Sequence, residues 1–205
     1  MAEEDFSHIL QPYFPEESIQ NVIKWISDYK IIFTITQKRN SVLGDYHSPY
    51  NNQGHRISVN GDLNRYSFLI TFLHEMAHLT TWEKYRRSVP SHGMEWKEEF
   101  KVVSDELRGK KIFPRDVTAA LKRYLINPSA THCVDPDLVK VLNTYNKKSV
   151  LHLDDLREGM LFSSHGNRTF RKGERLRKRF KCYEIKTNRI YLFSPMAEIK
   201  KVEDL

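Results

Sequence analysis

Residues 68–100, "FLITFLHEMAHLTTWEKYRRSVPSHGMEWKEEF", place two histidines four apart around a glutamate and a third histidine after a proline. Apolar residues recur at helical spacing here, which predicts a helix over residues 64–86 that ends before Pro90. Residues four apart share one side of a helix, so His74 and His78 can bind the same metal ion. The pattern therefore predicts a metal site on this helix.

Glu75 follows the first of these histidines and projects about 100° further round the helix. It is therefore expected beside the metal and out of line with the two ligands. In zinc hydrolases a carboxylate in this place takes a proton from the attacking water and later passes it to the leaving group. The alternative interpretation is a pair of ordinary histidines on a half-exposed helix face.

A third ligand is needed, because a catalytic zinc ion has three protein ligands and one open position. Pro90 turns the chain back, and the next helix, expected over residues 93–109, begins just after His92. We expect His92 to complete the site, with Glu95 or Glu99 on the same helix face as the alternatives. The predicted site holds one Zn²⁺ ion on three histidines, His74, His78 and His92.

The segments "FLHEMAHL" (72–79) and "SHGMEWKEEF" (91–100) resemble the paired motifs of the SprT-like zinc metallopeptidases. That family includes the Spartan proteases, which degrade proteins crosslinked to DNA. The resemblance covers about residues 15–125 and implies that Glu75 is the general base and that Trp96 packs between two helices. The zinc ligands that it implies are His74, His78 and His92.

The C-terminal part of the chain departs from this family. Many SprT-like proteins carry a zinc ribbon there, whereas this chain has only two cysteines, Cys133 and Cys182. Two distant cysteines make neither a ribbon nor a disulfide framework, so we expect buried thiols in a reducing compartment.

Residues 1–133 are predicted to form an α+β zincin-like metallopeptidase domain, with helices packed on a small antiparallel sheet. Besides the two helices already described, we expect helices over residues 15–29 and 113–127. Strands are expected over residues 30–39 and 55–60, on either side of the turn-rich segment 44–54.

Residues 134–149 are interpreted as a connecting segment with one short helix over 136–145. In residues 150–205, short β-favouring runs alternate with turn signals, which is typical of a compact all-β domain. We expect a small SH3-like barrel of five strands. Leu176, Phe180 or Tyr183 is available to its core.

The net charge of +7 is concentrated in residues 168–181, which hold eight lysines and arginines against one glutamate. Basic residues interleaved with aromatic rings suit phosphate contacts and base stacking, so we expect binding of DNA, particularly single-stranded DNA, or RNA. An acidic protein partner or a solvated edge strand is the alternative. The predicted contacts are Arg171, Lys172, Arg175, Arg177, Lys178, Arg179 and Lys181.

Residues that could support a developing oxyanion are less well defined. Four tyrosines are candidates, namely Tyr46, Tyr50, Tyr66 and Tyr85. His47 and His55 flank a turn before the metal-site helix and are interpreted as solvent-exposed or hydrogen-bonded histidines. The alternative is that one of them lines the substrate cleft.

These patterns support two main functional hypotheses. The first is a zinc-dependent metalloendopeptidase that cleaves protein or peptide substrates, including proteins bound to nucleic acid. The second is a non-proteolytic nucleic-acid-binding or regulatory protein with structural zinc, which would not need Glu75; another zinc hydrolase is a third option. The N-terminus is acidic and no apolar run reaches about 18 residues, so we expect a cytoplasmic protein with no membrane contact, which is free to associate with the nucleoid.

Overall fold

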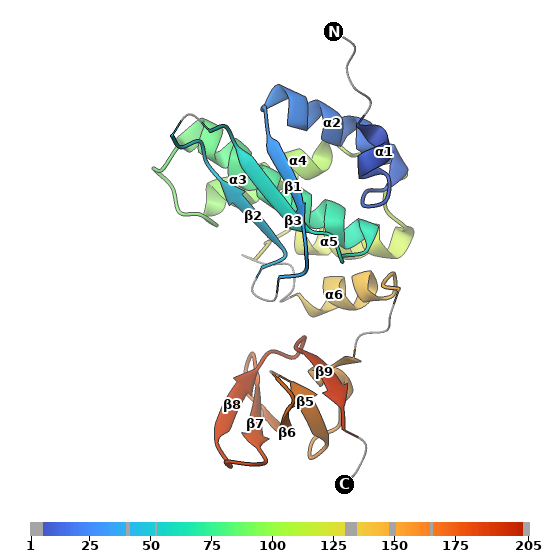
Figure 1. Cartoon of the computed structure of the whole chain (residues 1–205), viewed down its shortest axis with the longest axis vertical. Helices are drawn as coiled ribbons and strands as arrows, with labels where there is room; N and C mark the ends of the chain where they lie inside the picture. Colours follow the sequence, from blue (N-terminus) through green and yellow to red (C-terminus); the bar gives the residue numbers. More distant parts are fainter. Residues whose placement is uncertain are drawn as a thin grey trace. The chain divides into compact units, whose positions relative to one another are not determined.

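The computed structural model describes residues 6–39, 42–51, 53–129, 135–147, 151–164 and 166–202. The chain divides into two compact units, Met1–His132 and Cys133–Leu205 (Figure 1). Among the described residues, no helix is both long and apolar enough to cross a membrane.

The first unit contains a three-stranded sheet in which β3 lies between β1 and β2 (Figure 1). The strands are β1 (Ile32–Thr36), β2 (Gly44–His47) and β3 (Arg56–Asn60). β2 is antiparallel to β3, but β1 is parallel to it, so the predicted antiparallel sheet is wrong. The added strand β2, in a segment expected to be turn, reverses the chain once more and makes β1 and β3 parallel.

Helices α1 (Ser7–Leu10) and α2 (Ile19–Asp28), with the short 3₁₀ helix η1 (Glu16–Ser18), precede the sheet. The predicted metal-site helix is α3 (Arg65–Tyr85), and it packs against β2, β3 and α4 (Met94–Asp105). The unit continues with α5 (Arg115–Tyr124), which follows Pro114 as expected.

α3 is the central element of the first unit. Asn64 caps it, because its side-chain oxygen accepts hydrogen bonds from the backbone N–H groups of Tyr66 and Ser67, at 3.1 and 3.0 Å. The helix is buried almost all round, which is typical of a helix that crosses a core. Phe68 and Phe72 pack edge-on against Phe14 in this core. The position of α3 relative to the sheet is therefore set by packing on several faces.

The second unit begins with α6 (Pro136–Asn143), within the predicted connecting segment, and continues as a β-sheet. Its strands pair in the order β4-β9-β5-β6-β7-β8, each antiparallel to its neighbours. Their bounds are β4 (Leu151–His152), β5 (Leu161–Ser164), β6 (Arg168–Arg175), β7 (Phe180–Glu184), β8 (Ile190–Phe193) and β9 (Glu198–Lys201).

The expected closed SH3-like barrel of five strands is not found. Within the described part of the unit, no ladder joins β4 to β8, so the sheet of six strands has two open edges. β4 has only two residues before the chain turns into the 3₁₀ helix η3 (Leu153–Asp155), which leaves too little strand to close a barrel.

The core of the second unit gathers aromatic rings under the sheet, chiefly Phe162, Phe170, Phe180 and Phe193. Cys182 is a buried free thiol in this core, as predicted. The other cysteine, residue 133, lies outside the described residues. Of the three predicted core candidates, Phe180 is buried, whereas Leu176 is exposed.

Candidate metal centre

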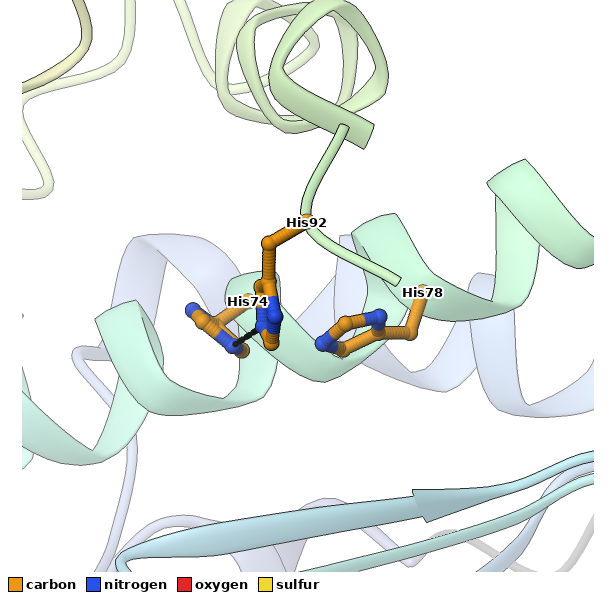
Figure 2. A group of neighbouring side chains, drawn as sticks. All are labelled: His74, His78 and His92. Carbon is orange, nitrogen blue, oxygen red and sulfur yellow. Dashed lines mark hydrogen bonds between the residues drawn. The ribbon is translucent and has the colours of Figure 1, made fainter. Parts of the chain in front are cut away.

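The structure brings together the three histidines that the sequence selects as ligands. His74 and His78 project from the same side of α3, and His92 approaches them from the segment just before α4 (Figure 2). One ring nitrogen of each lies within 4.8 Å of the others. The turn at Pro90, where the Gly93 N–H donates to the Pro90 carbonyl at 3.0 Å, reverses the chain and places His92 over the helix.

One distance within this group matches that expected around a tetrahedral metal ion. The Nε2 atoms of His74 and His92 are 3.3 Å apart. Two imidazole nitrogens bound to one tetrahedral zinc ion are separated by about 3.3 Å, given bonds of ~2.0–2.1 Å. The donor set is therefore suited to a zinc-like divalent ion.

The protonation of the histidines favours the same role. Burial lowers the pKa of His78 to about 3, with a smaller effect from the neighbouring His92. Burial also lowers the pKa of His92. Neutral imidazoles have the free lone pair that a metal ligand needs.

Trp96 of α4 forms the wall behind the histidines. It is fully buried, and its ring centroid lies 4.7 Å from the ring centroids of both His74 and His92. The predicted packing role between the two helices is confirmed. A fixed ring on this side limits the orientations available to the imidazoles.

The alternative third ligands do not join the group. The cluster of ligand atoms in the described residues consists of the three histidines and includes neither Glu95 nor Glu99. The buried carboxylate of Glu99 pairs instead with Lys84, with a distance of 2.6 Å between Nζ and Oε1. The geometry therefore favours His92.

Glu75 opens onto the same cleft as the histidines, together with Gly44, Asp45 and Tyr46 of β2. Its side chain is 6% exposed. Burial, together with a smaller effect of the charge on Asp45, raises the pKa of Glu75 to about 8, and Arg39 partly opposes this rise. In the metal-free protein this carboxyl group is therefore mainly protonated at neutral pH, and a cation at the histidines would favour its ionised form.

Gly44 lies close to Glu75 in this cleft. A β-carbon at this position would lie 2.7 Å from Oε1 of Glu75 and 2.6 Å from Cγ2 of Thr71. Such contacts are too short, so a larger residue would displace the side chain of Glu75 or Thr71, or move α3 or β2. Gly44 was not singled out from the sequence, because its closeness to Glu75 depends on β2, in a segment that was expected to be turn.

Tyr46 lies beside His78 and is linked to a buried polar chain. Its ring is nearly parallel to that of His78, with 6.3 Å between centroids and 5° between planes. Its hydroxyl is 3.0 Å from Nδ1 of His55, and Nε2 of His55 is 2.9 Å from the Glu83 carboxylate. His55 is thus a hydrogen-bonded histidine, one of the two kinds that the sequence interpretation allowed, and it is buried.

This chain of hydrogen bonds limits what Tyr46 can do. A neutral His55 that donates Nε2–H to Glu83 accepts the phenolic proton of Tyr46 at Nδ1. Burial raises the pKa of Tyr46 and lowers the pKa of His55, so both stay neutral near pH 7. Of the four candidate tyrosines, Tyr46 is the one that lines the cleft, but its proton is directed away from it.

The sequence model of the SprT-like family matches residues 2–118, more than half of the 205 residues. The chain belongs to the SprT-like family. No curated protein and no solved structure matches it. The SprT-like match contains the three histidines and Glu75, and it ends before the second unit begins.

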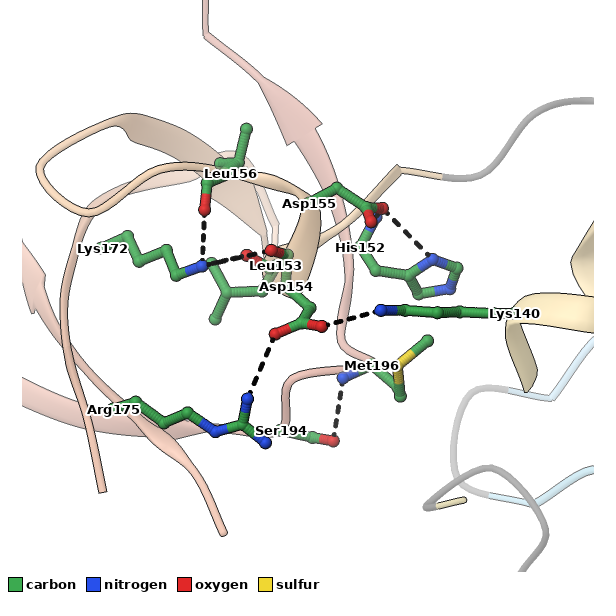
Figure 3. A network of polar contacts seen from close by, with 10 residues as sticks. All are labelled: Lys140, His152, Leu153, Asp154, Asp155, Leu156, Lys172, Arg175, Ser194 and Met196. Carbon is green, nitrogen blue, oxygen red and sulfur yellow. Dashed lines mark hydrogen bonds and ion pairs between the residues drawn. The ribbon is translucent and has the colours of Figure 1, made fainter. Parts of the chain in front are cut away.

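The basic residues predicted to contact nucleic acid lie on β6, on β7 and in the turn between them. Five are exposed and Lys181 is half-buried; the exposed ones are Arg171, Arg175, Arg177, Lys178 and Arg179. Arg175 also forms an ion pair with Asp154, at 3.7 Å (Figure 3).

Lys172 does not belong to this exposed set. Its side chain is 5% exposed, and its ammonium donates to the carbonyl oxygens of Leu153 and Leu156, at 2.8 and 2.6 Å (Figure 3). It also lies 3.9 Å from the centre of the Phe180 ring. The amine fixes the turn of η3 from inside the unit, so it is not available to a phosphate.

Proposed function

We propose that this SprT-like protein is a zinc-dependent metalloendopeptidase. The observation that carries the proposal is the common cleft of three converging imidazoles and the buried carboxyl group of Glu75. A zinc ion bound there would activate a water molecule for attack and polarise the scissile carbonyl. Residues of this chain would carry out the proton transfers and position the substrate.

Glu75 acts as the general base of the proposed reaction. Its ionised carboxylate takes a proton from the attacking water and later delivers it to the leaving amine. A group with a pKa near the working pH can both accept and return a proton, and burial raises the pKa of Glu75 to about 8 before any cation is bound. Gly44 leaves the carboxyl group room beside β2.

β2 provides a place for an extended substrate. It is an edge strand of the sheet and lines the cleft through Gly44, Asp45 and Tyr46. A peptide that pairs with its open edge would run past Glu75 and the histidines, with backbone hydrogen bonds fixing its direction. This arrangement favours cleavage of unfolded or extended segments.

The competing function is a regulatory or nucleic-acid-binding protein with structural zinc. A structural zinc ion is normally enclosed by four protein ligands. The ligand group in the described residues has three side chains and lies in an open cleft, which supports the catalytic proposal. A general base would also have no use in a structural site.

We further infer that the substrates include proteins bound to DNA or RNA, reached in the cytoplasm or at the nucleoid. The exposed arginines and lysines of the β6–β7 region support this inference, because they hold the excess charge of the chain. The acidic backbone of single-stranded DNA is the simplest partner of that charge.

The test incubates zinc-loaded protein with a DNA-binding protein substrate, with and without single-stranded DNA. Glu75→Gln is the matched control, since it keeps the size of the side chain, and zinc content is measured for both proteins. We expect cleavage by the wild type only, at equal zinc content. Equal cleavage by the variant, or no cleavage of any protein substrate by the wild type, would overturn the proposal.

A further inference from the structure

The outer edge of the second unit is an open strand with exposed aliphatic side chains. β8 pairs with β7 on one side and, among the residues that the structure describes, with no strand on the other. Ile190 is 55% exposed and Leu192 is 50% exposed, although both are large apolar residues. Edge strands are usually protected by charge or proline, so an unprotected apolar edge indicates a binding surface.

The same face continues inward as a row of basic and aromatic residues. Lys181 is opposite Leu192, Tyr183 is opposite Ile190, and Arg171 is opposite Tyr183 on the next strand. The cationic groups of Arg171 and Lys181 lie 5.9 and 5.7 Å from the centre of the Tyr183 ring. The apolar edge is therefore bordered by positive charge.

These features select one kind of occupant. Alternate backbone N–H and C=O groups of an edge strand point outward, which suits an added peptide strand. A second copy of this chain would bring the same cations together, and nucleobases prefer aromatic rings to aliphatic side chains such as Ile190 and Leu192. Charge complementarity instead favours a peptide with acidic side chains.

We propose that β8 is an acceptor strand for a partner protein, which it binds through an extended segment of alternating acidic and aliphatic residues. Aliphatic side chains of the segment cover Ile190 and Leu192, and its carboxylates face Lys181 and Arg171. This contact is separate from the metal centre and does not depend on the proposed protease activity. With a strand of four residues, the interface is small and the binding reversible.

The test uses the full chain and a fluorescent nine-residue peptide that alternates glutamate with valine or isoleucine. Binding is followed by anisotropy, with a lysine-for-glutamate peptide and an oligothymidine strand as the other two probes. We expect only the acidic peptide to bind in a manner that depends on β8. The double variant Ile190→Thr with Leu192→Thr keeps strand propensity and should weaken binding roughly tenfold, because it removes apolar contact.

Ile126→Thr is the matched control, since it removes an exposed isoleucine from the first unit and should leave peptide binding unchanged. Lys181→Glu, a second variant with the apolar edge intact, should also weaken binding. Thermal unfolding of each variant checks its folding. The proposal is wrong if the acidic peptide binds the threonine variant and the wild type equally, if it does not bind the wild type, or if oligothymidine alone requires β8.

Discussion

Gly44 of β2 and Glu75 of α3 are in such close contact that no side chain fits between them. The β-carbon position of Gly44 is 2.7 Å from Oε1 of Glu75. β2 is the edge strand that would receive the substrate, and Glu75 is the carboxyl group that would act as the base. Their close approach at Gly44 sets the distance between them. Any residue larger than glycine must separate them.

Gly44→Ala is therefore expected to lower kcat while zinc is still bound. The added methyl group displaces Glu75, and a displacement of about 1 Å in a catalytic group can reduce the rate ~100-fold. The measurement is the cleavage rate at equal zinc content. Adding Thr71→Ser removes the other close contact, at Cγ2 of Thr71, and keeps its hydroxyl. If that double variant recovers full activity, Glu75 is not the group that Gly44 accommodates.

The stability of the metal-free protein should depend on pH through Glu75. Burial raises its pKa to about 8 from an ordinary value of 4.5, so between these values the folded state binds more protons than the unfolded state. Stability then falls as pH rises from about 4.5 to about 8, by on the order of 1.4 kcal/mol per unit of pKa shift.

Urea unfolding of wild type and Glu75→Gln in the presence of a chelator, at pH 5 and pH 8, measures this effect. The lowered pKa values of His78 and His92 make stability rise with pH up to about 6.5, but they are common to both proteins. The free energy of unfolding of the wild type, relative to that of Glu75→Gln, should therefore be lower at pH 8 than at pH 5. A constant difference would mean that Glu75 keeps an ordinary pKa.

His92→Ala should weaken zinc binding by more than about 10- to 100-fold. That range is the usual cost of losing a residue that hydrogen-bonds to a metal ligand without binding the metal itself. Glu99→Gln is the comparison, because this carboxylate lies on the next helix and pairs with Lys84 instead of joining the histidines. Competition titration with a zinc chelator measures both affinities. A larger effect from Glu99→Gln would make that carboxylate the third ligand.

Tyr46→Phe should change the cleavage rate by less than about tenfold. The phenol donates its proton to His55, so its loss removes a buried hydrogen bond worth ~1 kcal/mol of stability and leaves the ring beside His78. Kinetics together with urea unfolding separate the two effects. A loss near 100-fold in kcat with unchanged stability would instead identify the phenol as an oxyanion donor.

The helix and the grouping of the three histidines could be predicted from sequence because their causes are local. The spacing of His74 and His78 lies within one helix, Asn64 caps that helix, and Pro90 turns the chain to bring back His92. β2 could not be predicted in the same way. Gly44 and neighbouring polar residues are poor strand formers, and they are extended because β3 lies beside them.

The sheet of the second unit could not be predicted for the same reason, because it too depends on contacts between distant residues. The sequence shows short strands and turns, but whether a sheet closes depends on which distant strands pair. The register of β6 changes between Lys172 and Arg175, so simple alternation does not tell which basic residues face inward. Lys172 faces the core opposite Cys182 and finds partners in carbonyl groups 16 and 19 residues away.

Lys172→Met should therefore destabilise the protein without altering contact with nucleic acid. The variant leaves the carbonyl oxygens of Leu153 and Leu156 without their buried donor, at a cost of about 1–3 kcal/mol. Arg177→Glu with Arg179→Glu, at two exposed positions, should have the opposite profile, with unchanged stability and weaker, less salt-dependent binding of single-stranded DNA. Thermal unfolding and salt-dependent anisotropy titrations give both quantities for each variant. If Lys172→Met lowers the salt dependence of DNA binding as much as the double arginine variant does, the amine of Lys172 contacts the nucleic acid. It would then have to leave its buried position when DNA binds.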